Sequence, residues 1–315
     1  MKAGAAMVSS EDINIGVDIA GLRLKNPVIA ASGTFGFGRE YSQYVDLNQL
    51  GGISVKGLTL EPRQGNKPPR IAETPAGILN SVGLQNPGVH YFIENEIPYI
   101  RQFDTAIIAN IAGNTVEDYC KMAQILDDTD IDAVELNVSC PNVKAGCVAF
   151  GNNPSGVYEI TSQVKKFCSK PLIVKLTPNV GDIRETAKAA EEAGADALSL
   201  INTILGMAID IHKKKPILAN NMGGLSGPAV KPIAVRMVYE VCQTVKIPVI
   251  GMGGISSGDD AVEFLLAGAS AVMVGTASFV NPRACIDVLD GIKSYMMKHK
   301  YMSIYDIIGS LELNQ

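Results

Sequence analysis

The chain has 315 residues, of which 47% are apolar and 19% are charged, and its formal net charge is −5. This size and composition favour one large α/β domain over residues 1–315, and the acidic balance argues against a nucleic-acid-binding surface. No apolar run reaches the roughly 18 residues that span a bilayer, and the N-terminus lacks a signal-like pattern, so we expect a cytoplasmic protein without membrane contact.

The predicted elements alternate along the chain. Residues 13–24 alternate around a turn at Gly21 and predict a small hairpin that caps the barrel floor. Eight short apolar, β-branched runs follow, at 26–32, 53–59, 106–113, 133–139, 171–177, 197–203, 248–254 and 271–277, and each ends in or just after Gly, Ser or Thr. Apolar residues recur at helical spacing in 115–127, 156–169, 183–193, 231–245, 259–267 and 284–298.

This alternation predicts a closed (β/α)8 barrel, the TIM-barrel fold. A doubly wound open sheet is the alternative, but its glycine fingerprint should follow the first strand, and residues 31–36 do not fit it. A long insertion at 61–104, after the second strand, contains six prolines, including Pro62, Pro68, Pro69, Pro75 and Pro87. Loops of this length inside a compact domain are usually functional.

The C-terminal ends of barrel strands carry catalytic residues, and here they are rich in amides and lysines. The strand ends supply Ser32, Lys56, Asn110, Asn137, Lys175, Asn202 and Thr203, and the insertion adds Asn80. Converging Asn side chains suit a planar ligand with alternating N–H and C=O groups, such as a pyrimidine ring. A metal is not predicted, because no strand end has a His/Asp/Glu cluster and Glu135 lies inside its strand.

Cys140 is the candidate base. It lies in the segment Asn137-Val138-Ser139-Cys140-Pro141-Asn142, directly after a predicted strand and before a glycine-containing loop. A thiol at the mouth of a barrel can accept a proton from a substrate. A buried, inert cysteine is the alternative. The six cysteines form no close CxxC pair, so neither a zinc site nor a disulfide framework is predicted.

Glycines follow the last two predicted strands, at 251–254 and at Gly275-Thr276. Barrels commonly bind phosphate at this place, through backbone N–H groups. The glycine-rich stretch 223–227 could add contacts. A phosphate site, lysines, a thiol and amides together fit a flavin mononucleotide (FMN) enzyme acting on a small heterocycle, in which Lys175 stabilises negative charge on the flavin. Lys175 could instead be a structural ion-pair partner.

Several segments carry a resemblance to a known family. They are 26–33, 83–88, 137–142, 174–179, 201–203 and 251–254, and the match covers essentially the whole chain after a short N-terminal extension. In these segments the chain resembles the catalytic subunit of class 1 dihydroorotate dehydrogenases. Cys140 favours this class over the membrane-bound class, which has Ser at the matching position.

The resemblance implies one FMN per chain and oxidation of dihydroorotate to orotate in pyrimidine (UMP) synthesis. Cys140 would take the C5 proton while hydride passes from C6 to flavin N5. Flavin contacts would fall on Ser32, Lys56, Gly57, Asn110, Asn137, Lys175, Ile201, Gly227, Gly253, Gly254, Gly275 and Thr276. Substrate contacts would fall on Lys56, Asn80, Ser81, Val82, Gly83, Leu84, Asn137, Asn202 and Thr203.

Residues 142–151 resemble the NAD-linked subclass. That subclass pairs with an electron-transfer subunit carrying FAD and a [2Fe-2S] cluster, with a homodimer core within a heterotetramer. Three alternatives stay open: a fumarate-linked class 1 dihydroorotate dehydrogenase, a flavin-dependent pyrimidine reductase, and a phosphate-binding barrel without flavin.

Overall fold

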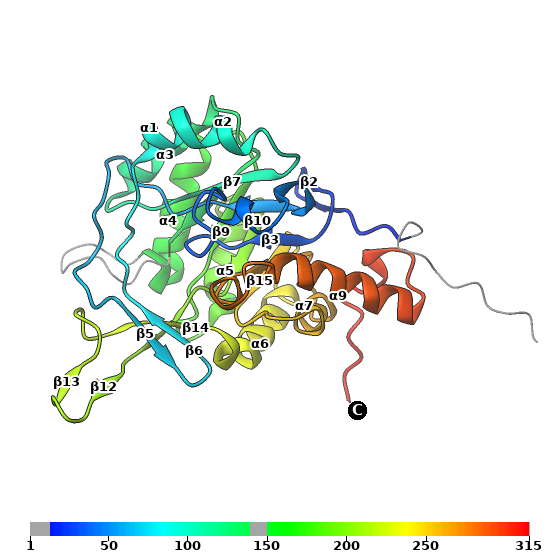
Figure 1. Ribbon diagram of the computed structural model, residues 1–315. Coiled ribbons are helices and arrows are strands. Elements are labelled where there is room, and N and C mark those ends of the chain that lie inside the picture. The colour runs from blue at the N-terminus through cyan, green and yellow to red at the C-terminus, as the bar shows by residue number, and fades with distance from the viewer. Residues whose placement is uncertain (1–12, 139–149, 315) are drawn as a thin grey trace, which may run out of the picture.

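The computed structural model describes residues 13–138 and 150–314 and has a closed barrel of eight parallel strands at its centre (Figure 1). In chain order the barrel strands are β3 (Val28–Ala30), β4 (Gly52–Ser54), β7 (Ala106–Ile111), β8 (Ala133–Asn137), β9 (Leu172–Lys175), β10 (Ala197–Leu200), β15 (Val249–Met252) and β16 (Ala271–Val274). Strand β10 pairs with both β9 and β15, and β16 pairs with β3, which closes the barrel. The predicted (β/α)8 barrel is confirmed, and the doubly wound alternative is wrong.

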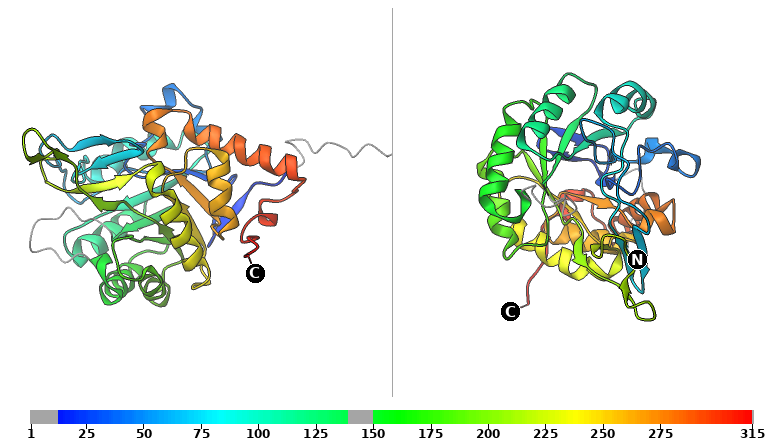
Figure 2. Two further views of the ribbon diagram at one scale, coloured as in Figure 1. Left: turned by 90° about the horizontal axis from the view of Figure 1, so that it is seen from below. Right: turned by 90° about the vertical axis from the view of Figure 1, so that its left-hand side faces the viewer.

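Helices surround the barrel, as the view in the right panel of Figure 2 shows. Those that connect successive strands are α3 (Val116–Asp127), α4 (Pro154–Lys165), α5 (Ile183–Glu192), α6 (Lys231–Cys242) and α7 (Gly258–Leu266), and after β16 come α8 (Ala277–Val280) and α9 (Ala284–His299). Strands such as β16 are buried along their whole length, because the barrel interior covers one face and the helices cover the other. The six predicted helices correspond to α3 to α7 and α9.

The N-terminal segment forms the predicted hairpin, with β1 (Val17–Ile19) antiparallel to β2 (Leu22–Leu24). Its inward side chains are buried and alternate with exposed ones, so that Ile19 is buried whereas Asp18 is exposed. Gly21 makes the turn at a φ of +92°, a conformation that glycine adopts without a steric cost. Because the hairpin leads directly into β3, it lies at the N-terminal end of the barrel.

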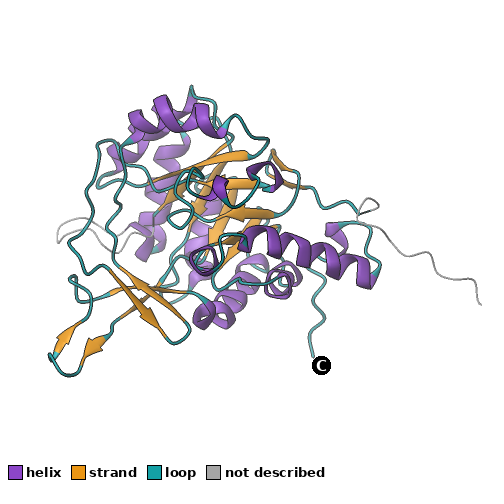
Figure 3. Cartoon of the chain, viewed as in Figure 1, coloured by secondary structure: helices purple, strands orange, loops and turns teal. Residues whose placement is uncertain are grey.

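A second, antiparallel sheet lies at the opposite end of the barrel and was not predicted. Its order is β11-β14-β6-β5, with β5 (Ile71–Thr74), β6 (Gly77–Asn80), β11 (Ile204–Gly206) and β14 (Gly223–Ser226). We call it the mouth sheet. Figure 3 shows it apart from the barrel strands, next to a small hairpin of β12 (Ile209–Asp210) and β13 (Lys215–Pro216). The insertion after β4 therefore pairs with the segment after β10.

Short helical pieces complete the described chain. The second half of the insertion contains α1 (Val89–Tyr91), a π-helical turn (Phe92–Glu96) and α2 (Ile97–Ile100). The 3-10 turns are Tyr41–Gln43, Leu47–Gln49, Phe150–Asn152, Pro228–Val230 and Ile304–Asp306. No helix within residues 13–138 and 150–314 combines the length and the apolar composition that a membrane crossing requires.

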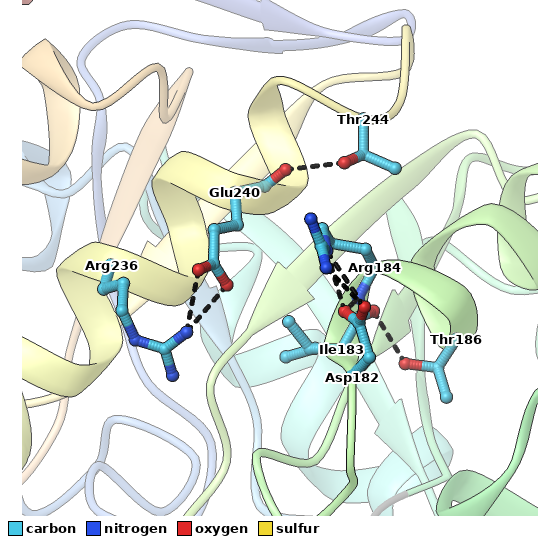
Figure 4. Close-up of polar contacts among 7 residues, drawn as sticks. All are labelled: Asp182, Ile183, Arg184, Thr186, Arg236, Glu240 and Thr244. Atoms are coloured by element: carbon cyan, nitrogen blue, oxygen red, sulfur yellow. Dashed lines mark hydrogen bonds and ion pairs between the residues drawn. The ribbon is translucent and has the colours of Figure 1, made fainter.

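The outer helices are stabilised by local polar contacts, and Figure 4 shows those around α5 and α6. Asp182 accepts a hydrogen bond from the backbone N–H of Arg184 at 2.9 Å and so caps α5. Its carboxylate also pairs with the Arg184 guanidinium, and these hydrogen bonds lower the pKa of Asp182 to about 2. On α6, Arg236 pairs with Glu240 one turn later at 2.8 Å. These contacts stabilise the helices that surround the barrel.

Candidate active site

A cavity of about 220 Å³ opens at the C-terminal mouth of the barrel. All eight barrel strands, or the residues directly after them, contribute to its lining, and the mouth sheet adds Ile71, Ile78 and Leu225. A second cavity of about 510 Å³ adjoins it, since both are lined by Gly227, Gly254 and other residues. This is the end at which barrel enzymes place their ligands.

The structure brings nearly all of the predicted site residues into this one cavity. Its lining includes Ser32, Lys56, Gly57, Asn80, Val82, Gly83, Leu84, Asn110, Asn137, Lys175, Ile201, Asn202, Thr203, Gly227, Gly253, Gly254, Gly275 and Thr276. Ser81 differs, because its side chain is fully buried and does not line the cavity. Cys140 lies outside the described residues.

A buried ion pair lies at the base of the cavity. The Lys175 ammonium is 3.9 Å from the carboxylate of Glu135, and it donates a hydrogen bond of 3.0 Å to the Ser32 hydroxyl. The side chain of Lys175 is 5% exposed and that of Glu135 is 0% exposed. Lys175 therefore has an ion-pair partner and also lines the cavity, so its geometry is compatible with either of the two interpretations offered for it.

Glu135 is ionised in spite of its burial. Burial by itself raises the pKa of a carboxyl group. Lys175 and hydrogen bonds from Ser199, Ser54 and Asn110 outweigh that effect and hold the pKa of Glu135 below its ordinary value. The site therefore has one buried negative charge beneath it as well as the positive charge of Lys175.

Asn110 presents its two polar atoms in different directions. The Nδ2 group donates a hydrogen bond of 2.6 Å to Glu135. The Oδ1 atom is buried and has no hydrogen-bond partner among the residues that the structure describes. A Cβ on Gly57 would lie 2.9 Å from this oxygen, so glycine leaves room for it. A buried acceptor of this kind is suited to an N–H donor of a ligand.

Glycines shape the other side of the cavity, after β15 and β16. Gly254 has a φ of +81°, and a Cβ there would lie 2.8 Å from the Gly227 carbonyl oxygen. Nearby, the Thr276 hydroxyl donates a hydrogen bond of 2.8 Å to Ser226, which ties the end of β16 to β14. The loops after the seventh and eighth strands of barrels are a common phosphate site, so the backbone fits the phosphate of a mononucleotide.

The amide side chains at the sixth strand end are held by a local network. Asn179 donates a hydrogen bond of 2.9 Å to the Thr203 carbonyl, and it accepts one from the Leu205 backbone N–H. The Asn202 side-chain oxygen accepts from the Thr203 N–H at 2.8 Å. In the mouth sheet, where β14 lies between β11 and β6, Asn80 donates to the Gly224 carbonyl at 3.4 Å. These contacts position polar groups around the mouth.

Flavin mononucleotide fits this set of residues. The cavity has glycine turns for a phosphate, a buried lysine for negative charge on a ring, and the unpartnered oxygen of Asn110 for a ring N–H. Among the described residues, no group of three or more His, Cys, Asp or Glu side chains is placed to hold a metal ion.

Some lining residues were not predicted from the sequence. They are Ala31, Gly33, Thr34, Ile71, Ile78, Leu225, Ser226, Val230, Met252, Met273 and Phe279. Ala31 and Gly33 lie next to Ser32, and Leu225 and Ser226 lie within the glycine-rich stretch 223–227, so these motifs could have included them individually. Ile71 and Ile78 carry no such signal, because they reach the cavity only through the mouth sheet.

This architecture defines a class: a (β/α)8-barrel protein with a cavity at its C-terminal mouth. Comparison with known proteins then gives the family. A family model described as dihydroorotate dehydrogenase matches residues 14–296. The chain belongs to the dihydroorotate dehydrogenase family and is therefore an oxidoreductase of a flavin-dependent family.

Two relatives illustrate the similarity. The chain is 64% identical over 298 residues to a protein of Alkaliphilus oremlandii, and the aligned region covers 95% of this chain and 99% of the relative. It is 61% identical over 302 residues to one of Thermoanaerobacter pseudethanolicus, covering 96% of this chain and 100% of the relative. Both relatives are named "Dihydroorotate dehydrogenase B (NAD(+)), catalytic subunit".

Proposed function

We propose that this chain is the catalytic subunit of an NAD-linked dihydroorotate dehydrogenase, which oxidises (S)-dihydroorotate to orotate in pyrimidine synthesis. The observation that carries the proposal is the convergence of lysines, amides and glycine turns from all eight strand ends on one cavity. Relatives of nearly equal length that bear this name support it.

FMN would be held by two sides of the mouth. Gly253, Gly254, Gly275 and Thr276 would receive the phosphate, and Ser32, Lys56, Gly57, Asn110, Asn137, Lys175, Ile201 and Gly227 would surround the rest of the molecule. When bound, FMN supplies a two-electron acceptor for hydride. The ammonium of Lys175 would stabilise the negative charge that this acceptor gains.

The chain itself would bind and orient the substrate. Lys56 would neutralise the substrate carboxylate, and the amides of Asn80, Asn137 and Asn202 would hold the ring through its N–H and C=O groups. Backbone and side chains of 82–84 and Thr203 would complete the substrate site. Fixing the ring in one orientation converts a bimolecular encounter into an ordered reaction, which is a large part of catalysis.

Cys140 would remove the C5 proton. A thiol has an ordinary pKa of about 8.5, so only a few per cent is thiolate at neutral pH. The assignment rests on the sequence segment around Cys140, since this residue lies outside the described part of the chain.

Electrons would leave through a partner. We propose an electron-transfer subunit with FAD and a [2Fe-2S] cluster, and a homodimer core within a heterotetramer. The word "subunit" in the names of the relatives supports a partner. The cytoplasm is the proposed compartment, which suits the free thiols of Cys120, Cys168, Cys242 and Cys285.

The test is the visible absorption spectrum of the purified protein, before and after anaerobic addition of dihydroorotate. We expect flavin bands that bleach on addition, because the substrate reduces the cofactor. A colourless protein contradicts the flavin site. A coloured protein that bleaches with reduced pyrimidines such as dihydrouracil, but not with dihydroorotate, favours a pyrimidine reductase. Recovery of colour with NAD⁺ only in the presence of the partner subunit would support the NAD-linked assignment over the fumarate-linked one.

A further inference from the structure

We propose that Glu135 is a positioning residue for the flavin site, which orients Asn110 and Lys175 and lowers the reduction potential of the bound flavin. This inference rests on the proposed function, because it requires a flavin above the ion pair. It goes further in assigning a role to a carboxylate that does not itself line the cavity.

Glu135 is the centre of a network that joins five neighbouring barrel strands. Its Oε2 atom accepts hydrogen bonds from the Ser54 hydroxyl at 2.7 Å and from Asn110 Nδ2 at 2.6 Å, and its Oε1 atom accepts one from the Ser199 hydroxyl at 2.7 Å. The Lys175 ammonium is 3.9 Å from Oε2. These residues come from β4, β7, β8, β9 and β10, which are adjacent in the barrel order.

The geometry favours an ionised carboxylate. Three donors point at its two oxygens and an ammonium lies beside them, whereas a protonated carboxyl group would itself bring a donor into this set. Replacing a buried ion pair by apolar residues of similar volume is often neutral or stabilising. Stability of the fold therefore gives little reason for a charge at this depth, and the adjacent cavity gives one.

The first consequence concerns Asn110. Because Glu135 accepts from its Nδ2 group, the amide is oriented with Oδ1 directed elsewhere, and this buried acceptor has no partner within the described residues. Asn110 lines the cavity, so the oriented amide presents an acceptor and not a donor to the ligand. A neutral group in place of the carboxylate would remove the constraint on which way the amide faces.

The second consequence concerns charge. Reduction of a flavin adds negative charge to its ring, and a nearby ammonium favours that change. The carboxylate of Glu135 offsets the ammonium of Lys175, so the flavin is adjacent to a nearly neutral pair. Coulomb interactions between buried groups are only weakly screened. Removing the charge of Glu135 must therefore favour the reduced flavin and raise its potential.

The experiment measures the flavin reduction potential of the holoenzyme by spectroelectrochemical titration. In Glu135→Gln we expect the ratio of reduced to oxidised flavin, at the wild-type midpoint, to rise at least tenfold, which is about 30 mV for a two-electron couple. Glu96→Gln is the matched control. Glu96 is also a buried carboxylate with a cationic partner, Arg39 at 2.7 Å, but Arg39 does not line either cavity, whereas Lys175, the partner of Glu135, does. Its potential should equal that of the wild type.

A second comparison covers the case in which Glu135→Gln fails to fold with an unpaired Lys175. The double variant Glu135→Gln/Lys175→Met has neither buried charge, and Lys175→Met has only that of Glu135. We expect the potential of the double variant to lie above that of Lys175→Met by the same tenfold criterion. Equal potentials in this pair, or in Glu135→Gln and the wild type, overturn the inference. A wild-type protein without flavin instead overturns the proposed function.

Discussion

Two glycines of the proposed phosphate site should respond differently to the same substitution. In Gly275→Ala the added Cβ would lie 3.6 Å from the Cβ of Ala31 and 3.8 Å from Thr34, which are ordinary contacts. In Gly254→Ala it would lie 2.8 Å from the Gly227 carbonyl oxygen, at a φ of +81°. The first change affects the cavity alone, whereas the second also strains the fold.

The magnitudes follow from these distances. For Gly254→Ala, the left-handed backbone costs about 1–2 kcal/mol, overpacking costs about 1–3 kcal/mol, and the stiffer unfolded chain returns about 0.4–1 kcal/mol. The free energy of unfolding should thus fall by about 1–4.5 kcal/mol. For Gly275→Ala, where the same effect of the stiffer unfolded chain meets no strain, it should be unchanged or rise by up to about 1 kcal/mol. FMN affinity should fall at least tenfold in both, or about 1.4 kcal/mol.

Urea unfolding of the apoprotein measures the first quantity, and titration of FMN followed by flavin fluorescence measures the second. Gly181→Ala is the control, because its Cβ would meet no atom within 4 Å. It should leave the FMN affinity unchanged and raise the free energy of unfolding by no more than about 1 kcal/mol. Wild-type FMN affinity in Gly275→Ala would refute the assignment of the phosphate to this backbone. Wild-type stability in Gly254→Ala would refute the strain argument.

Three further predictions concern single side chains. Turnover of the wild type should rise with pH toward the thiol pKa of about 8.5, and Cys140→Ser should lose at least about 100-fold at pH 7; a variant with full turnover contradicts the base assignment. Lys56→Ala should raise the KM for dihydroorotate, and an unchanged KM in steady-state assays contradicts the substrate role. Because the pKa of Glu135 is below its ordinary value of 4.5 in the folded protein, its stabilisation is present above about pH 4.5 and is lost as pH falls through the folded pKa. Urea unfolding as a function of pH should therefore show a steeper acid decline for the wild type than for Glu135→Gln, and parallel curves contradict this.

The barrel could be predicted because each of its strands is a short local signal. A run such as Ala271–Val274 is apolar throughout and ends at a glycine, and the helix after it restores a 3.6-residue period. The mouth sheet has no such signal. Its pairing of Gly224 with Asn80 joins residues 144 positions apart, and β5 and β11 are partly exposed strands of three or four residues. Long-range register of this kind is not encoded in local periodicity.

The candidate site, like the fold, could be predicted from the sequence only in part. Reading the residues at strand ends predicted most of the cavity lining, because parallel strands present their C-terminal ends at one edge. The same rule passed over Glu135, which lies two residues before the end of β8 and looked like an interior strand position. Only closure of the barrel brings Ser54, Asn110, Lys175 and Ser199 to its carboxylate. The rule finds residues that line the cavity, but it misses residues such as Glu135, which contacts lining residues without lining the cavity itself.

The two kinds of residue occupy different arcs of the barrel, and this arrangement constrains the ligand. Strands β7 to β10 bring the amides and the pair of Lys175 and Glu135, whereas β15 and β16 bring the glycine turns. A ligand that satisfies both arcs needs a polar planar end and an anionic end, held apart across the mouth. A mononucleotide cofactor has this form, and a free pyrimidine does not. The barrel order therefore favours a bound cofactor that spans the cavity, with the smaller substrate held against it by residues of the insertion and the sixth strand.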